Sequence, residues 1–309
     1  MARFVRNVLT LLALGFLAHV CPPARGYADE PRALQPRARF FESNGVKLFY
    51  QDEGSGEPVV LLHGFTINGR INWDLPGITR ALSRDHRVLT LDARGHGRSE
   101  KPHDPAKYGI EMVEDVVRLL DHLKIEKAHI VGYSMGGFIT NKLVTTHPER
   151  VLTATQGGAG WGRTDDKPSF LDDLAVSLEQ GKGITPLLIA LHPPDSLPLD
   201  EDELKFANRM LTLTNDQKAL AALIRGTTGL SVPKEKLLQN RVPVLAIVGE
   251  RDPMKVGVDA MDGVMSNLKI VVIRGGDHMS TFYDPQFVRS LREFLAAHHA
   301  RPLIPAAAE

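Results

Sequence analysis

The chain has 309 residues, of which 43% are hydrophobic and 24% charged, and these fractions exclude global disorder and allow a large buried core. Its 37 basic and 37 acidic side chains give a formal net charge of zero, so no excess of charge indicates a nucleic-acid partner or an acidic tail. Cys21 is the only cysteine, which excludes a disulfide framework and a cysteine-based metal site.

The first thirty residues have the pattern of a secretory signal peptide. Arginines give a positive start, residues 8–20 are an almost uninterrupted apolar run, and residues 26–28 read Gly-Tyr-Ala. This order predicts cleavage after Ala28 and a secreted or periplasmic protein without a stable membrane span, because the run is shorter than the about 20 residues that cross a bilayer. Two alternatives stay open: an uncleaved N-terminal membrane anchor, and a lipoprotein modified at Cys21.

After a linker at residues 29–37, strand and helix patterns alternate along the chain. A hairpin is expected around Ser43-Asn44-Gly45. Short apolar runs, as in strands buried on both faces, lie at 58–62, 87–91, 128–131, 151–155, 242–248 and 268–273. One-sided helical patterns lie at 111–123, 135–146 and 286–298. The alternation predicts a mostly parallel central sheet with helices on both faces, an α/β fold.

Residues 160–238 break this alternation. The segment is longer than an ordinary crossover and holds helical patterns at 169–180, 202–212 and 216–226. We expect an inserted helical cap that divides the α/β core into residues 38–159 and 239–300. Trp161, Phe170 and Met210 are candidates for an apolar pocket and equally for ordinary core, and the cap sequence does not identify a substrate.

The strongest local motif is Gly132-Tyr133-Ser134-Met135-Gly136, between an apolar strand and a helical pattern. A serine hydroxyl is a weak nucleophile and must be presented to a base and a carbonyl at once. A sharp strand-to-helix turn does this, and glycines two residues away on either side relieve the crowding. We therefore predict Ser134 as a nucleophile. A plain glycine turn is the alternative.

Acyl transfer also needs two N–H donors for the oxyanion of the tetrahedral intermediate. One donor comes from the residue after the nucleophile, here Met135, and the other from a loop after an earlier strand. His63-Gly64-Phe65 directly follows the run at 58–62, which makes the Phe65 N–H the second candidate. His63 itself is expected to shape this loop rather than to act in catalysis.

A base and an acid are expected at the same edge of the sheet, since sites in open α/β sheets gather outside the carboxyl ends of the strands. His278 follows the run at 268–273 and is predicted as the base. Asp252, in a loop after the preceding strand, is predicted as the acid that holds the imidazole and stabilises its charged form. Asp277 and Glu250 are the alternatives for this carboxylate.

With these motifs in order, the chain resembles an α/β-hydrolase-fold enzyme of the serine esterase and lipase type, over about residues 40–298 and least in the cap. The resemblance rests on His63-Gly64-Phe65, on the sequence DARGHGRS at 92–99, on residues 132–136, on Gly-Glu-Arg-Asp-Pro at 249–253, and on Gly276-Asp277-His278.

This resemblance implies the order Ser134, Asp252, His278 for the catalytic residues. It also implies a structural loop at 92–99, in which Arg94 and His96 shape the site. Haloalkane dehalogenases and epoxide hydrolases of this fold carry an aspartate at the nucleophile position, so Ser134 favours acyl chemistry.

The sequence thus predicts hydrolysis of a small or medium carboxylic ester through an acyl-enzyme, with a small-molecule substrate, no metal and no organic cofactor. The same residues serve lactone or carbon–carbon bond hydrolysis, perhydrolysis and acyl transfer, so these alternatives stay open. A non-catalytic binding protein on a hydrolase scaffold is disfavoured, because Ser134, Asp252 and His278 are all present.

Overall fold

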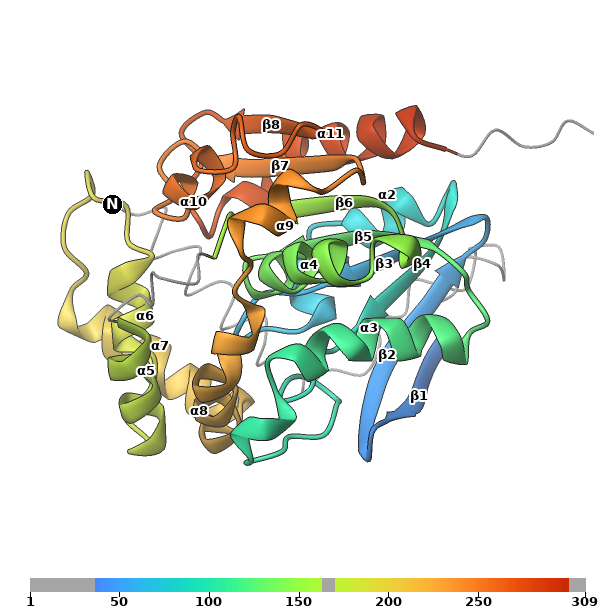
Figure 1. Cartoon of the computed structure of the whole chain (residues 1–309). Coiled ribbons are helices and arrows are strands. Elements are labelled where there is room, and N and C mark those ends of the chain that lie inside the picture. The colour runs from blue at the N-terminus through green and yellow to red at the C-terminus, as the bar shows by residue number, and fades with distance from the viewer. Residues whose placement is uncertain (1–36, 163–169, 300–309) are drawn as a thin grey trace, which may run out of the picture.

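The computed structural model describes residues 37–162 and 170–299 (Figure 1). The expected signal peptide at 1–28 lies outside the described residues. So does the expected linker at 29–37, except for Arg37, which begins the first strand. Within 37–162 and 170–299, no helix has the length and apolarity needed to cross a membrane.

The strands form one eight-stranded sheet with the order β1-β2-β4-β3-β5-β6-β7-β8. They are β1 (Arg37–Ser43), β2 (Val46–Gly54), β3 (Glu57–Leu62), β4 (His86–Leu91), β5 (Ala128–Tyr133), β6 (Val151–Gly157), β7 (Val244–Gly249) and β8 (Leu268–Ile273). β2 pairs antiparallel with β1 and β4, and every other pairing is parallel. The prediction of a mostly parallel sheet is confirmed.

The predicted hairpin joins β1 to β2. Ser43 pairs with Val46, and the two residues between them have positive φ angles, 50° at Asn44 and 74° at Gly45. Two-residue turns of this kind match the twist of the flanking strands, and asparagine and glycine accept positive φ most readily. The turn therefore fixes the register of the sheet edge.

Helices of the core cover both faces of the sheet (Figure 1). They are η2 (Arg70–Asp74), α2 (Ile78–Leu82), η3 (Pro105–Lys107), α3 (Ile110–His122), α4 (Met135–Thr146), η4 (Pro148–Arg150), α10 (Lys255–Asp259), η6 (Thr281–Tyr283) and α11 (Pro285–Ala297). Successive side chains of a strand point to opposite faces. In β3, accordingly, Val60 and Leu62 join the cluster with α3 and α4, whereas Val59 and Leu61 join the cluster with α2 and α11.

Further helices lie between β6 and β7, in the region predicted as the cap. They are α5 (Phe170–Glu179), α6 (Thr185–Ala190), α7 (Glu201–Thr214), α8 (Gln217–Gly226), η5 (Thr227–Leu230) and α9 (Lys234–Leu238). In Figure 1 α5 to α8 stand beside the carboxyl ends of the central strands. The sequence patterns predict α5, α7 and α8, but not the short helices α6 and α9.

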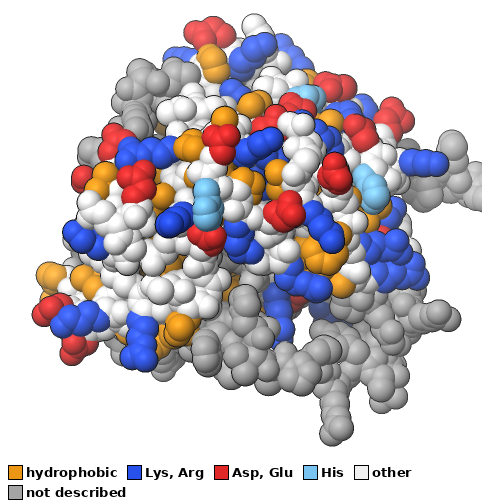
Figure 2. All heavy atoms as spheres, turned by 90° about the horizontal axis from the view of Figure 1, so that it is seen from below, with side chains coloured by type: hydrophobic (Ala, Val, Ile, Leu, Met, Phe, Trp, Pro, Cys, Tyr) orange, Lys and Arg blue, Asp and Glu red, His pale blue; other side chains and the backbone are white. Residues whose placement is uncertain are grey.

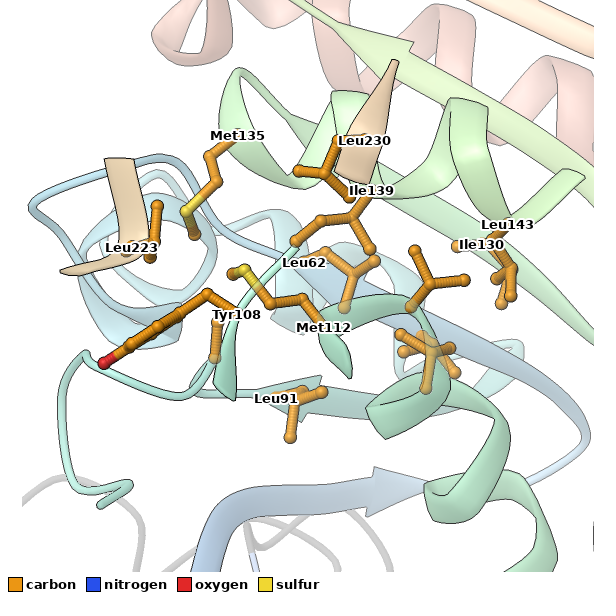
Figure 3. Packing of buried hydrophobic residues seen from close by; sticks show 14 of the residues in the cluster. Leu62, Leu91, Tyr108, Met112, Ile130, Met135, Ile139, Leu143, Leu223 and Leu230 are labelled. Carbon is orange, nitrogen blue, oxygen red and sulfur yellow. The ribbon is translucent and has the colours of Figure 1, made fainter. Parts of the chain in front are cut away.

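The cap and the core share one hydrophobic cluster. Figure 3 shows Leu223 of α8 and Leu230 of η5 converging on Met135 of α4 and Met112 of α3. Met210 is 8% exposed within the same cluster, and Trp161 and Phe170 pack against it half-buried. The cap is therefore held to the core by apolar burial, which contributes about 25 cal/mol for each Å² removed from water.

The outer surface carries charges of both signs. Figure 2 shows Lys and Arg side chains interspersed with Asp and Glu side chains over the face seen from below. This mixture agrees with the zero formal net charge of the chain.

Candidate active site

Ser134 lies in the sharp turn between β5 and α4. Its φ of 51° and ψ of −114° are unfavourable for a non-glycine residue and typically cost about 1–3 kcal/mol. The glycines around it are needed for space. A Cβ atom added to Gly132 would lie 2.0 Å from the carbonyl oxygen of Gly136, and one added to Gly136 would lie 2.1 Å from that of Leu62. The turn therefore exposes the serine side chain at the end of the strand.

The structure brings together Ser134, His278 and Asp252, the three side chains predicted as nucleophile, base and acid. Ser134 Oγ lies 3.0 Å from His278 Nε2, and His278 Nδ1 lies 2.9 Å from Asp252 Oδ2. His278 and Asp252 are each 3% exposed, whereas Ser134 is half-buried. With the carboxylate at Nδ1, the Nδ1 atom carries the proton and Nε2 accepts the serine hydroxyl.

The two alternative carboxylates bind elsewhere. Asp277 Oδ1 accepts the N–H groups of Met279 (3.0 Å) and Ser280 (2.8 Å), and so shapes the loop that carries His278. Glu250 Oε2 accepts the Gly275 N–H at 2.8 Å. Of the three carboxylates weighed from the sequence, Asp252 is therefore the one that contacts the imidazole.

Tyr133, the residue before Ser134, contacts both the backbone and the ring of His278. Its hydroxyl donates a hydrogen bond of 2.7 Å to the His278 carbonyl, and its ring packs against Phe282. Burial raises the pKa of Tyr133 well above its usual value, so the hydroxyl keeps the proton that it donates. Sequence reasoning missed this residue, because its partner is 145 positions away along the chain.

The loop after β3 lies directly against the serine turn. A Cβ atom on Gly64 would be 3.5 Å from Ser134 Cβ, and the Gly136 N–H donates to the His63 carbonyl at 3.1 Å. Neither the Phe65 nor the Met135 N–H donates a backbone hydrogen bond within the part of the chain that the structure describes. Both predicted donors thus lie close to the serine turn, since Met135 directly follows Ser134 and Phe65 directly follows Gly64.

His63 lies inside this loop, and both of its ring nitrogens bind backbone groups. Its Nδ1 donates to the Gly64 carbonyl at 2.8 Å, and its Nε2 accepts the Ala93 N–H at 3.0 Å. Burial lowers the pKa of His63, which favours the neutral ring, and the two hydrogen bonds fix its tautomer. Asn72, which the sequence did not indicate, accepts the Gly64 N–H at 2.8 Å.

The loop at 92–99 packs behind these residues. His96 lies 5.1 Å from His63 between ring centroids, and burial lowers its pKa well below the usual value. Arg94 is fully buried and donates to both oxygens of Asp115, at 2.7 and 2.6 Å. These contacts are those of side chains that shape a loop, as the resemblance implies for Arg94 and His96.

Two further features lie outside this site. A hollow of about 460 Å³ opens at the amino-terminal ends of β3 and β5, lined by Glu57, Arg87 and Lys127 among others, at the opposite edge of the sheet from Ser134. Among the described residues, no group of three or more His, Cys, Asp or Glu side chains is arranged to hold a metal ion.

Known proteins share this fold. Residues 57–180 match the family model of the alpha/beta hydrolase fold. The chain is 29% identical over 264 residues to a pimeloyl-[acyl-carrier protein] methyl ester esterase of Aliivibrio fischeri. The matched region covers 81% of this chain and 98% of that protein.

Two solved structures extend the comparison. One, described as an N-acyl homoserine lactone degrading enzyme, is 28% identical with a TM-score of 0.65 and covers 83% of this chain and 100% of its own. The other, an alpha/beta hydrolase enzyme from a Medee basin deep-sea metagenome library, has a TM-score of 0.73 at 19% identity, covers 86% of this chain and 100% of its own, and shows the fold alone. The sheet, the serine turn and these similarities together show that the chain has the α/β-hydrolase fold.

Proposed function

We propose that this protein is a serine hydrolase that cleaves a carboxylic ester through an acyl-enzyme on Ser134. The observation that carries the proposal is the chain of contacts from Ser134 Oγ to His278 Nε2 (3.0 Å) and from His278 Nδ1 to Asp252 (2.9 Å). A nucleophile within reach of a base, which is in turn oriented by a carboxylate, is the arrangement that activates a hydroxyl. The similarity to an ester hydrolase supports hydrolysis in general.

In the first half of the proposed reaction, Ser134 Oγ attacks the ester carbonyl while His278 Nε2 takes its proton. Asp252 stabilises the resulting imidazolium, and the N–H groups of Phe65 and Met135 bind the oxyanion. The tetrahedral intermediate then collapses, and His278 returns the proton to the leaving alkoxide.

The second half repeats these steps with water. His278 takes a proton from the water as it attacks the acyl-enzyme, and the carboxylic acid leaves as Ser134 regains its hydrogen. The protein's own side chains supply every proton transfer in this scheme.

Lactone hydrolysis is the second candidate. The similarity to an N-acyl homoserine lactone degrading enzyme favours it, at 28% identity over 83% of this chain. A lactone is an internal ester, so the same atoms react, and the alcohol stays tethered to the acyl group. A panel of linear esters and γ-lactones with matched acyl lengths separates the two through their kcat/KM values.

The test of the proposed function uses p-nitrophenyl acetate and butyrate with the wild type and Ser134→Ala. Loss of the nucleophile should lower kcat on the order of a million-fold. Ser231→Ala, in the segment between η5 and α9, is the matched control and should retain the wild-type rate. Equal activity of wild type and Ser134→Ala would reject the proposal. A folded protein that a fluorophosphonate does not label would favour the non-catalytic alternative.

We also propose that the segment before Asp29 is an export signal, on the basis of its composition alone. Expression of the full chain in a bacterial host, followed by cell fractionation and N-terminal sequencing, tests this. A mature protein that begins at Asp29 in the periplasm or medium supports the proposal, whereas retention of the intact segment in the membrane supports an anchor.

A further inference from the structure

The loop at residues 63–67 is fixed at most of its peptide groups. The Gly64 N–H donates to Asn72 Oδ1 at 2.8 Å, and the Gly64 carbonyl accepts from His63 Nδ1 at 2.8 Å. That carbonyl belongs to the same peptide unit as the Phe65 N–H, so the bond also fixes the direction of this N–H. The loop is thus tied in a way that leaves the Phe65 N–H available to an oxyanion.

The next residue, Thr66, has an unfavourable backbone conformation. Its φ is 67°, in the left-handed region that β-branched residues rarely adopt. Such a conformation costs about 1–3 kcal/mol and persists only where its surroundings hold it. The Thr66 N–H donates to His96 Nε2 at 3.2 Å, and the Thr66 carbonyl accepts from Asn215 Nδ2 at 3.1 Å. The first of these hydrogen-bond partners, His96, belongs to the core, and the second, Asn215, belongs to the cap.

Asn215 is itself firmly placed. It is the C-cap residue of α7, with an extended backbone, and its N–H donates to the Leu211 carbonyl at 2.9 Å. Its Nδ2 atom also lies 2.9 Å from Thr214 Oγ1, so the two amide hydrogens serve two acceptors. The following residue, Asp216, is the N-cap of α8, and its carboxylate lies 2.8 Å from His103 Nε2 of the core. The junction of α7 and α8 is thus anchored beside the loop.

We propose that Asn215 is a positioning residue. Through it, the cap holds the loop at residues 63–67, here called the oxyanion loop, in the conformation that directs the Phe65 N–H at the oxyanion. By donating to the Thr66 carbonyl, it keeps Thr66 in the left-handed region and thereby keeps the Phe65 N–H directed at the carbonyl that Ser134 attacks. The inference rests on the proposed function and adds a cap residue to it.

The contact with the Thr66 carbonyl requires a hydrogen-bond donor at position 215. The Thr66 carbonyl can only accept, so a carboxylate of the same shape at position 215 meets it with an acceptor and repels it. Asn215→Asp therefore reverses the contact without a change in volume, and Asn215→Ala removes it without adding charge. Asn208→Asp, on the same helix, is the matched control, because Asn208 Nδ2 donates to Thr185 Oγ1 of the cap and not to the loop.

The experiment measures kcat and KM for p-nitrophenyl butyrate, and the affinity of a trifluoromethyl ketone, with the full-length variants. Both Asn215 variants should lose about 10- to 100-fold in kcat with KM nearly unchanged, less than the about 100- to 1000-fold cost of removing an oxyanion donor outright. The ketone should weaken by the same factor, because its oxyanion adduct uses the same donors. Asn208→Asp should have the kcat of the wild type. Asn215→Ala should have the melting temperature of the wild type.

Three results would overturn the proposal. They are wild-type kcat in both Asn215 variants, a change confined to KM, and an equal loss in Asn208→Asp, which would assign the effect to cap integrity. If Ser134→Ala instead retains wild-type activity, the proposed function fails and this inference fails with it. An inactive Ser134→Ala together with fully active Asn215 variants rejects the role of Asn215 alone.

Discussion

The hydroxyl of Tyr133 donates a hydrogen bond of 2.7 Å to the backbone carbonyl of His278. The residue next to the proposed nucleophile therefore holds the residue that is proposed to deprotonate it. The bond crosses from the end of β5 to the loop after β8, which are separated by β6 and β7 in the strand order.

Tyr133→Phe should remove this bond without changing the shape of the core. A buried carbonyl that loses its donor costs about 1–3 kcal/mol, so we expect a lower melting temperature. We also expect a roughly tenfold lower kcat, or about 1.4 kcal/mol, since the imidazole is less well oriented. Thermal unfolding and steady-state kinetics measure the two effects. Tyr283→Phe, which changes the exposed neighbour of Phe282, is the control and should alter neither quantity. An unchanged kcat in Tyr133→Phe would show that the bond does not position His278.

Asp252→Asn should lower kcat on the order of 10,000-fold while leaving the fold intact. An amide keeps the shape of the carboxylate but stabilises neither the imidazolium nor the required tautomer. Glu250→Gln serves as the comparison, because the amide oxygen can still accept the Gly275 N–H that Glu250 binds. Measured kcat values for the pair decide between the two carboxylates, and an equal loss in both would reject the assignment to Asp252.

Stability should fall as the pH drops below about 6.5. Burial lowers the pKa values of His63, His86, His96 and His129, so the unfolded chain takes up protons that the folded chain does not. The contribution of these groups is present above the unfolded pKa and is lost as the pH falls toward the folded values. Each such proton adds about 1.4 kcal/mol per pH unit to the slope. Urea unfolding at pH 7.5, 6.0 and 5.0 measures it, and a flat profile would contradict the expectation.

Asp74 should contribute with the opposite sign. Burial raises the pKa of Asp74 to about 6, and Thr79 Oγ1 donates to its carboxyl at 2.6 Å. Its contribution is present below the unfolded pKa and is lost as the pH rises through about 6. Asp74→Asn should therefore stabilise the protein by about 3 kcal/mol at pH 8 and by about 1 kcal/mol at pH 4.5. A gain at pH 4.5 equal to that at pH 8 would show that the carboxylate is not penalised.

Much of the fold was predictable because the central strands of the sheet are buried on both faces. Continuous apolar runs marked β3, β4, β7 and β8 to within one or two residues. The short helices α2, α6, α9 and α10 were not predicted, since five or six residues carry too little periodicity to distinguish a helix from a loop. Their positions depend on packing against the rest of the molecule.

The residues of the candidate site also fall into two groups: those that the local sequence indicates and those that only the structure identifies. Ser134 and His278 were indicated by local sequence, because turns and strand ends leave a record in neighbouring residues. The choice among Asp252, Asp277 and Glu250 required geometry, since all three lie in loops at one edge of the sheet. The contact of Asn215 with Thr66 links positions 149 apart and leaves no local pattern.

The bonds around residues 132–136 have a consequence for how the site tolerates change. Ser134 is carried by this pentapeptide, His278 is tied to it through Tyr133, and the loop after β3 is tied to it through the Gly136 N–H. Two segments from distant parts of the chain are therefore positioned relative to this one short stretch. We therefore expect insertions in the other sheet connections to leave these relative positions intact. On the proposed role of Asn215, a change of cap sequence reaches the site through the loop at residues 63–67.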